Sequence, residues 1–215
     1  MDATLLHTDV LVIGAGPTGL MAGAWLQNFG IDARVIDMKS GPTRESRALA
    51  LQARSMEIYR QLGLADEVKR RSVPTGEMRP GIGSRSFKSI KLNRLGYAQT
   101  PFAGLTMLEQ SANEELLADY LKDAGNEVLW EHGYESFSDT GDQLLIKCTG
   151  PQGPVHISAR YVIAADGASS PIRESLGIAF EGKTDDEVFY VLDAQGVTGM
   201  GSGINLRFSD ENFML

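Results

Sequence analysis

A glycine triplet of the form G-x-G-x-x-G, spanning Gly14–Gly19, constrains this chain more than any other feature of its sequence. The β-branched run Val10–Ile13 precedes it directly and predicts a buried parallel strand. Pro17–Phe29 follows and predicts a helix, because proline lacks the N–H that a first helical turn leaves unpaired. Ala33–Asp37 predicts a second strand that ends in an acid. A glycine-rich turn that joins a strand to a helix, followed by another strand, indicates an α/β fold.

The triplet has the form that binds the pyrophosphate of a dinucleotide. Its first glycine allows a tight turn, its second lets the phosphate approach the backbone, and its third lets helix and strand pack closely. The helix N-terminus offers aligned N–H groups and a partial positive charge to the phosphates. An acid at the end of the next strand accepts hydrogen bonds from a ribose hydroxyl. The expected binding residues are Gly14, Gly16, Pro17, Thr18, Gly19 and Asp37. The alternative is an ordinary glycine-rich turn.

Charge and cysteine content exclude several classes of function. A net charge of −8 argues against nucleic-acid binding, which needs a basic surface. The three histidines and the single cysteine, Cys148, have no metal-ligand spacing, so we expect no metal site. One cysteine cannot form an internal disulfide, which fits a reducing compartment. Because Val10–Ile13 is too short to cross a membrane or to form a signal-peptide core, we expect a cytoplasmic protein that does not bind membranes.

Beyond the second strand, helical and irregular patterns alternate. Arg54–Leu62 predicts a helix. The prolines and glycines of residues 73–104 predict irregular chain around one short strand pair near 87–92. Ser111–Glu114 has the pattern of a capping box, in which a serine hydroxyl and a glutamate carboxylate satisfy N–H groups at the start of a helix.

Short strands follow that helix. The strand-like segments are Glu127–Trp130, Tyr134–Ser138, Gln143–Cys148 and Val155–Ala159. Tyr161–Ala165 then predicts another buried strand, which ends at Asp166. Ser170 and Pro171 predict the N-cap and the first residue of a short helix.

Three longer segments resemble the class A flavoprotein monooxygenases, the para-hydroxybenzoate hydroxylase-like family. Gly41–Gly63 resembles the segment that follows the second strand in that family. Leu108–Gln110 resembles its glutamine-bearing FAD contact. Tyr161–Gly177 resembles its second signature, an Asp-Gly followed by Ser and Arg. The three segments lie in the family's order and spacing, and the resemblance extends over nearly the whole chain.

The resemblance implies an FAD- and NAD(P)H-dependent monooxygenase that hydroxylates an aromatic or polyketide-like small molecule. It implies that Arg47 contacts the FAD near the path of NAD(P)H and that Gln110 also contacts the FAD. It implies that Tyr134 offers only its backbone to the adenine. Asp166 would lie near both dinucleotides, at the carboxyl end of its strand. The alternatives are a solvated surface residue for Arg47 and a turn or helix-start aspartate for Asp166. No catalytic side chain is identified, because the flavin supplies this chemistry.

The resemblance also predicts the division of the chain. We expect a Rossmann-like FAD-binding domain over residues 1–179, with an irregular insertion at 73–104, interleaved with a β-rich substrate region that starts at 180 and is truncated at 215. The family's third signature is a Gly-Asp, but Gly141-Asp142 lies ahead of the Asp-Gly motif, so we interpret it as a turn. An open strand edge at Phe213–Leu215 favours a homo-oligomer or pairing with another chain. We therefore expect the 215-residue chain alone to bind FAD weakly and to turn over no NAD(P)H.

Two alternatives remain open. One is another FAD enzyme of this architecture, such as a flavin-dependent halogenase or a prenyl reductase. Halogenases of this superfamily usually carry a Trp-x-Trp-x-Ile stretch, whereas Trp25 and Trp130 here stand far apart. The other is a catalytically inactive FAD- or nucleotide-binding fragment.

Overall fold

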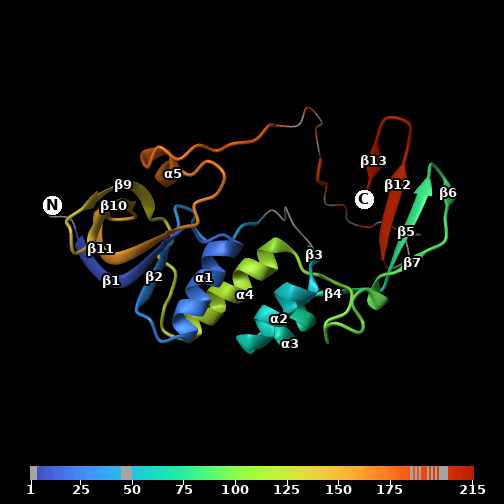
Figure 1. Cartoon of the computed structure of the whole chain (residues 1–215), viewed down its shortest axis with the longest axis horizontal. Helices are drawn as coiled ribbons and strands as arrows, with labels where there is room; N and C mark the ends of the chain where they lie inside the picture. Colours follow the sequence, from blue (N-terminus) through green and yellow to red (C-terminus); the bar gives the residue numbers. More distant parts are fainter. Residues whose placement is uncertain are drawn as a thin grey trace. The chain divides into compact units, whose positions relative to one another are not determined.

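The computed structural model describes two compact units of the chain. The described residues are 4–44, 50–184, 186, 188, 190–192, 194, 196, 198 and 203–215. The first unit combines Met1–Ser46 with Gln110–Asp186, and the second combines Arg47–Glu109 with Glu187–Leu215. Each unit is described by itself below, with the labels of Figure 1.

A five-stranded sheet forms the centre of the first unit. Its strands are β1 (Thr4–Ile13), β2 (Ala33–Ile36), β9 (Gly133–Asp139), β10 (Leu144–Gly150) and β11 (Gly153–Ala164), in the order β2-β1-β11-β10-β9. β1 runs parallel to both β2 and β11, whereas β10 runs antiparallel to both of its neighbours. Leu11, Ile36, Ile146 and Ile157 are completely buried in a core formed by this sheet. The sheet therefore joins a parallel half to an antiparallel half through β11.

Two helices of this unit lie side by side, α1 (Pro17–Asn28) and α4 (Gln110–Asp123) (Figure 1). Gly23 of α1 lies where a helix must come close to its neighbours. A Cβ atom at this position would be 2.6 Å from a methyl group of Val35 on β2 and 3.4 Å from Leu121 on α4. A short helix, α5 (Pro171–Ser175), follows β11. The predicted order of strand, glycine turn, helix and strand is thus confirmed.

The capping box predicted at Ser111–Glu114 is wrong. α4 begins at Gln110, so Ser111 lies inside the helix rather than before it. The carboxylate of Glu114 accepts a hydrogen bond from the backbone N–H of Thr43, in the loop after β2. The glutamate that the pattern assigned to the start of the helix therefore also binds a loop that is distant in sequence.

The prediction that Tyr161–Ala165 forms a buried strand is only half correct. Tyr161–Ala164 do belong to β11, but Tyr161 is 62% exposed. The register explains the exposure, since β10 pairs with β11 only as far as Ala159 while β1 continues to Ala164. Beyond Ala159, β11 therefore pairs with β1 alone among the strands that the structure describes.

The described residues of the second unit form two small sheets and two α-helices. Its helices are α2 (Ala53–Gln61) and α3 (Ala65–Arg71), with a short 3-10 helix η1 (Leu92–Arg94). One sheet has the order β3-β8-β4, from β3 (Ala50–Leu51), β4 (Val73–Thr75) and β8 (Leu105–Met107). The other has the order β13-β12-β5-β6, with β7 on β5, from β5 (Glu77–Ile82), β6 (Arg85–Ser86), β7 (Ile90–Lys91), β12 (Ile204–Phe208) and β13 (Phe213–Met214).

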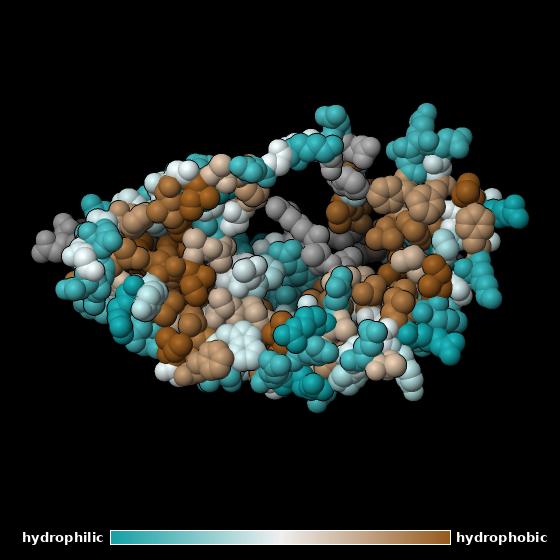
Figure 2. All heavy atoms as spheres, viewed as in Figure 1, coloured by the Kyte–Doolittle hydropathy of each residue, from teal (hydrophilic) through white to brown (hydrophobic). Residues whose placement is uncertain are grey.

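This unit departs from the sequence-based expectation in two ways. Within residues 73–104, expected to be largely irregular, the part from 73 to 91 forms four short strands, and Pro80 lies within one of them although proline weakens a strand prediction. β12 runs parallel to β5, so two segments far apart in sequence share one sheet. Apolar side chains gather over β12 and β13, where the rings of Phe208 and Phe213 are 6.5 Å apart (Figure 2). The predicted boundary between an FAD-binding domain that ends at residue 179 and a substrate region that starts at residue 180 stays a prediction. The two compact units divide the chain at other residues.

Candidate dinucleotide-binding site

Packing explains two of the three glycines at the turn between β1 and α1. Gly14 has a φ of +104°, and a Cβ atom there would lie 2.3 Å from the carbonyl oxygen of Ala165. A Cβ atom at Gly19 would lie 1.8 Å from the carbonyl oxygen of Gly14. A side chain at Gly14 would push the turn away from the end of β11. A side chain at Gly19 would push the start of α1 away from Gly14.

Gly16 requires a different explanation. A Cβ atom there would meet nothing within 4 Å, so the surrounding protein does not demand a glycine. Gly16 is the N-cap of α1, and Pro17 occupies the first helical turn. A glycine has no side chain to cap the first N–H groups, and Thr18 beside it is exposed. This open space over a helix N-terminus is where a pyrophosphate would sit.

Asp37, at the end of β2, holds the same turn from the side. Its Oδ2 accepts a hydrogen bond from the backbone N–H of Ala15 at 2.6 Å, and its Oδ1 accepts one from the N–H of Lys39 at 2.8 Å. The side chain is 10% exposed. Each carboxylate oxygen can accept more than one hydrogen bond. These contacts therefore leave acceptor capacity for a ribose hydroxyl.

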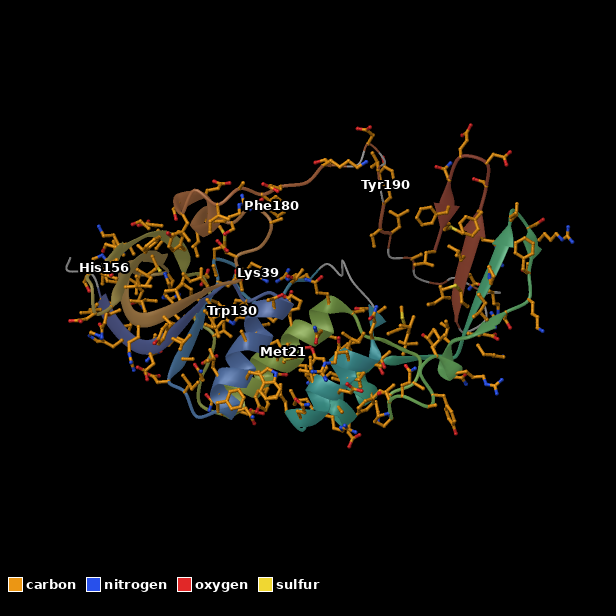
Figure 3. All side chains as sticks on the ribbon, in the orientation of Figure 1. Met21, Lys39, Trp130, His156, Phe180 and Tyr190 are labelled. Carbon is orange, nitrogen blue, oxygen red and sulfur yellow. The ribbon has the colours of Figure 1, made fainter. Side chains whose placement is uncertain are left out.

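Lys39 and Glu114 form an ion pair beside Asp37 that the sequence reasoning missed. Lys39 Nζ lies 3.2 Å from Glu114 Oε2, 3.9 Å from Asp37 Oδ2 and 3.4 Å from the carbonyl oxygen of Ala15. It also lies 5.9 Å from the centroid of the Trp130 ring (Figure 3). The only sequence signal at either residue was the capping-box glutamate, which pointed to a local role.

The Glu114 carboxylate stays charged although it is buried. Its side chain is 0% exposed. Burial acts to raise its pKa, but hydrogen bonds from Gln110 and Thr43 and the charge of Lys39 outweigh burial, so the pKa lies below its usual range. Gln110 Nε2 donates to Oε1 at 2.8 Å, while the N–H of Thr43 donates to Oε2 at 2.7 Å. Gln110, a predicted FAD contact, therefore belongs to the same hydrogen-bond network as the turn.

Asp166 lies directly behind the glycine turn. A Cβ atom at Gly14 would be 3.0 Å from the Asp166 Cα. The carboxylate of Asp166 accepts a hydrogen bond from Ser170 Oγ at 2.7 Å, and Ser170 Oγ caps α5 by accepting one from the N–H of Arg173 at 3.0 Å. These are the contacts of a helix-start aspartate. The predicted contact of Asp166 with dinucleotides stays a prediction.

Tyr134 and Arg47 are the two remaining predicted FAD contacts. Tyr134 lies on β9, and its ring packs against the hydrophobic core of the first unit, with a buried hydroxyl that has no hydrogen-bond partner among the described residues. The predicted contact of the Tyr134 backbone with the adenine stays a prediction. Arg47 lies outside the described residues.

Among the described residues, no three His, Cys, Asp or Glu side chains cluster in a way that would hold a metal ion. In that part of the chain there is also no helix with the length and hydropathy needed to cross a membrane.

The fold and this turn define a dinucleotide-binding α/β protein, with a parallel β-α-β unit, an open helix N-terminus and a strand-end aspartate. Residues 7–204 match the family described as FAD binding domain. The chain belongs to this family. The prediction of an α/β FAD-binding fold is confirmed.

Relatives and solved structures agree with this assignment. The chain is 34% identical over 206 residues to the FAD-dependent monooxygenase terD of Aspergillus terreus, covering 86% of this chain and 32% of that protein. It is 29% identical to a 12-dehydrotetracycline 5-monooxygenase/anhydrotetracycline 6-monooxygenase of Streptomyces rimosus, covering 87% of this chain and 36% of that protein. The structure of the flavin-dependent monooxygenase PieE in complex with FAD and substrate matches with a TM-score of 0.76 and 26% identity, covering 83% of this chain and 33% of that one. The chain therefore spans about a third of the length of these proteins.

Proposed function

We propose that this chain provides the FAD-binding part of an FAD- and NAD(P)H-dependent monooxygenase that hydroxylates an aromatic or polyketide-like small molecule. One structural observation carries the proposal. Among the three glycines of the turn, only Gly16 has open space where a side chain would lie, at the N-terminus of α1 and beside Asp37. The names of the related proteins, monooxygenases in each case, favour hydroxylation over a halogenase, a prenyl reductase or an inactive fragment.

The described residues fit FAD in distinct ways. The N–H groups at the start of α1 would hold the pyrophosphate against Gly16, with Pro17 and Thr18 in the first turn. Asp37 would accept the ribose hydroxyls. FAD, when bound, supplies the electron transfer and the oxygen chemistry, and the protein holds and orients it. Gln110, Asp166, the backbone of Tyr134 and, outside the described residues, Arg47 complete the proposed set of contacts.

Several finer points belong to the same proposal. NAD(P)H is the proposed reductant, and the cytoplasm is the proposed location, in keeping with a chain whose single cysteine cannot form an internal disulfide. The proposed partners are small molecules rather than nucleic acid, in keeping with the net charge of −8. An oligomer that pairs along the edge of β13 also remains a proposal. It is supported by the exposed side chains of Phe213 and Met214.

The test uses the longest protein that the gene encodes. It is purified, titrated with FAD and supplied with NADH or NADPH, phenols and polyketide aromatics under labelled O₂. We expect FAD to bind, NAD(P)H oxidation to rise with a substrate, and one labelled oxygen atom to enter the product. The Gly16→Val variant, which is expected not to bind FAD, serves as the control. Bound FAD with an unlabelled product would contradict hydroxylation, and absence of FAD binding would contradict the whole proposal.

A further inference from the structure

We propose that Glu114 is a positioning residue for the bound cofactor. It would act through Gln110 on one side and through Lys39 and the loop after β2 on the other. The inference rests on the proposed function for the identity of the ligand, FAD. The network itself is observed without any ligand.

The two oxygens of Glu114 bind different parts of the site. Oε1 accepts from Gln110 Nε2, one turn earlier on α4. Oε2 accepts from the N–H of Thr43 and from Lys39 Nζ, both in the segment after β2. One fully buried carboxylate thus joins the start of a helix to a loop 71 residues away in sequence.

Lys39 carries the connection on to the glycine turn. Its ammonium group contacts the carbonyl oxygen of Ala15 at 3.4 Å and the hydroxyl of Thr43 at 3.1 Å. The N–H of Ala15 in turn donates to Asp37. The turn that would hold the pyrophosphate is therefore linked, through the Glu114–Lys39 pair, to Gln110, which is expected near the ribityl–pyrophosphate part of FAD.

The chemistry of this position requires a carboxylate rather than a neutral acceptor. Glutamine at position 114 would have one oxygen and one NH₂ group in place of two acceptor oxygens. If its oxygen keeps Thr43 and Lys39, its NH₂ group meets the NH₂ group of Gln110, and two donors repel. Glu114→Gln should thus make Gln110 either leave this contact or reverse its amide, while the loop contacts stay in place.

The binding experiment compares FAD with ADP, which lacks the flavin half. We expect Glu114→Gln to weaken FAD binding by about five- to tenfold and to leave ADP binding nearly unchanged. Gln110→Ala should have the same effect, and the double variant should lose no more than either single variant, because the two residues act as one unit. Lys39→Met should weaken ADP and FAD alike. The control is Glu115→Gln, an exposed neighbour on α4.

Hydrogen exchange provides a second measurement that needs no ligand. Glu114→Gln should speed exchange in the first turn of α4, and Lys39→Met should speed it in residues 38–44. A purely structural role would instead weaken the binding of both ligands by the same factor. If Glu114→Gln does not fold, the Lys39→Met and Gln110→Ala variants carry the comparison.

The outcomes separate this inference from the proposed function. If Glu114→Gln binds FAD as tightly as the wild-type protein does, or if the losses add up in the double variant, the role of Glu114 alone is overturned. Failure of the wild-type protein to bind FAD would overturn the proposed function and the cofactor role of Glu114 together. A selective loss of FAD affinity with unchanged ADP affinity would support both.

Discussion

The backbone N–H of Ala15 donates a 2.6 Å hydrogen bond to the Oδ2 atom of Asp37. This bond fixes the middle of the glycine turn to the end of the neighbouring strand. Because Ile13 of β1 pairs with Ile36 of β2, the turn and the acid both follow the last paired residues of adjacent parallel strands. The acid proposed to bind a ribose therefore also sets the position of the turn proposed to bind the phosphates.

Asp37→Ala should weaken FAD binding by about 1–3 kcal/mol, because it removes the ribose acceptor and leaves the N–H of Ala15 without a partner. The flavin retained after dialysis, measured by its visible absorbance, reports the loss. Asp66→Ala is a suitable control, since the Asp66 side chain is 99% exposed. Retention equal to that of the wild type would contradict the assignment of Asp37 to the ribose.

Gly16→Val and Gly19→Ala should separate binding from folding. A side chain at Gly16 enters the open space over α1, so Gly16→Val should abolish FAD binding while circular dichroism and the melting temperature stay unchanged. At Gly19 the new Cβ atom would overlap a backbone oxygen, so Gly19→Ala should lower stability by roughly 1–3 kcal/mol. Flavin that copurifies with folded Gly16→Val would show that the phosphate lies elsewhere.

The buried Glu114 carboxylate should make stability depend on acid pH. Its pKa is lowered in the folded state, so its contribution is present above its unfolded pKa and is lost as the pH falls through its folded pKa. Lys39 faces it from the loop after β2, with Asp37 beyond. We expect the free energy of unfolding to fall more steeply between about pH 5 and pH 3 in the wild type than in Glu114→Gln. The free energies of unfolding are measured with urea at each pH. If they fall equally in the two proteins over this pH range, the assignment to Glu114 is contradicted.

The thiol of Cys148 should be unreactive in the folded chain. Burial raises its pKa to about 11, with a further contribution from the charge of Glu135, and the residue is 1% exposed. Since only the thiolate is a strong nucleophile, a thiol reagent at pH 8 should label Cys148 only after denaturant unfolds the chain. Rapid labelling without denaturant would show that β10 opens readily.

The glycine turn and its flanking elements could be predicted from the sequence because their signals are local. A β-branched run, three glycines and a proline follow each other within twenty residues, and each has one dominant structural interpretation. The same holds for Gly141, which lies in the turn between β9 and β10 with a φ of +94°, as predicted. The strand-end acid Asp37 was also found in this way, from its place after the second strand.

The partners of Glu114 could not be predicted in the same way. The sequence shows Ser111 and Glu114 at the spacing of a capping box, and this local pattern favours a local bond. Instead, α4 packs beside α1 and brings Glu114 to Thr43 and Lys39, whose donors satisfy a carboxylate that would otherwise be buried without partners.

The sequence by itself determined the β-α-β unit, its glycine turn and the acid of the second strand, because backbone constraints of glycine and proline act between neighbouring residues. Tertiary structure alone decided three other features: that β12 lies parallel to β5, that Tyr161 is exposed, and that Glu114 joins Lys39 to Gln110. Strand partners, burial and buried ion pairs depend on which distant segments meet in the folded chain. Patterns of neighbouring residues do not specify which distant segments come into contact.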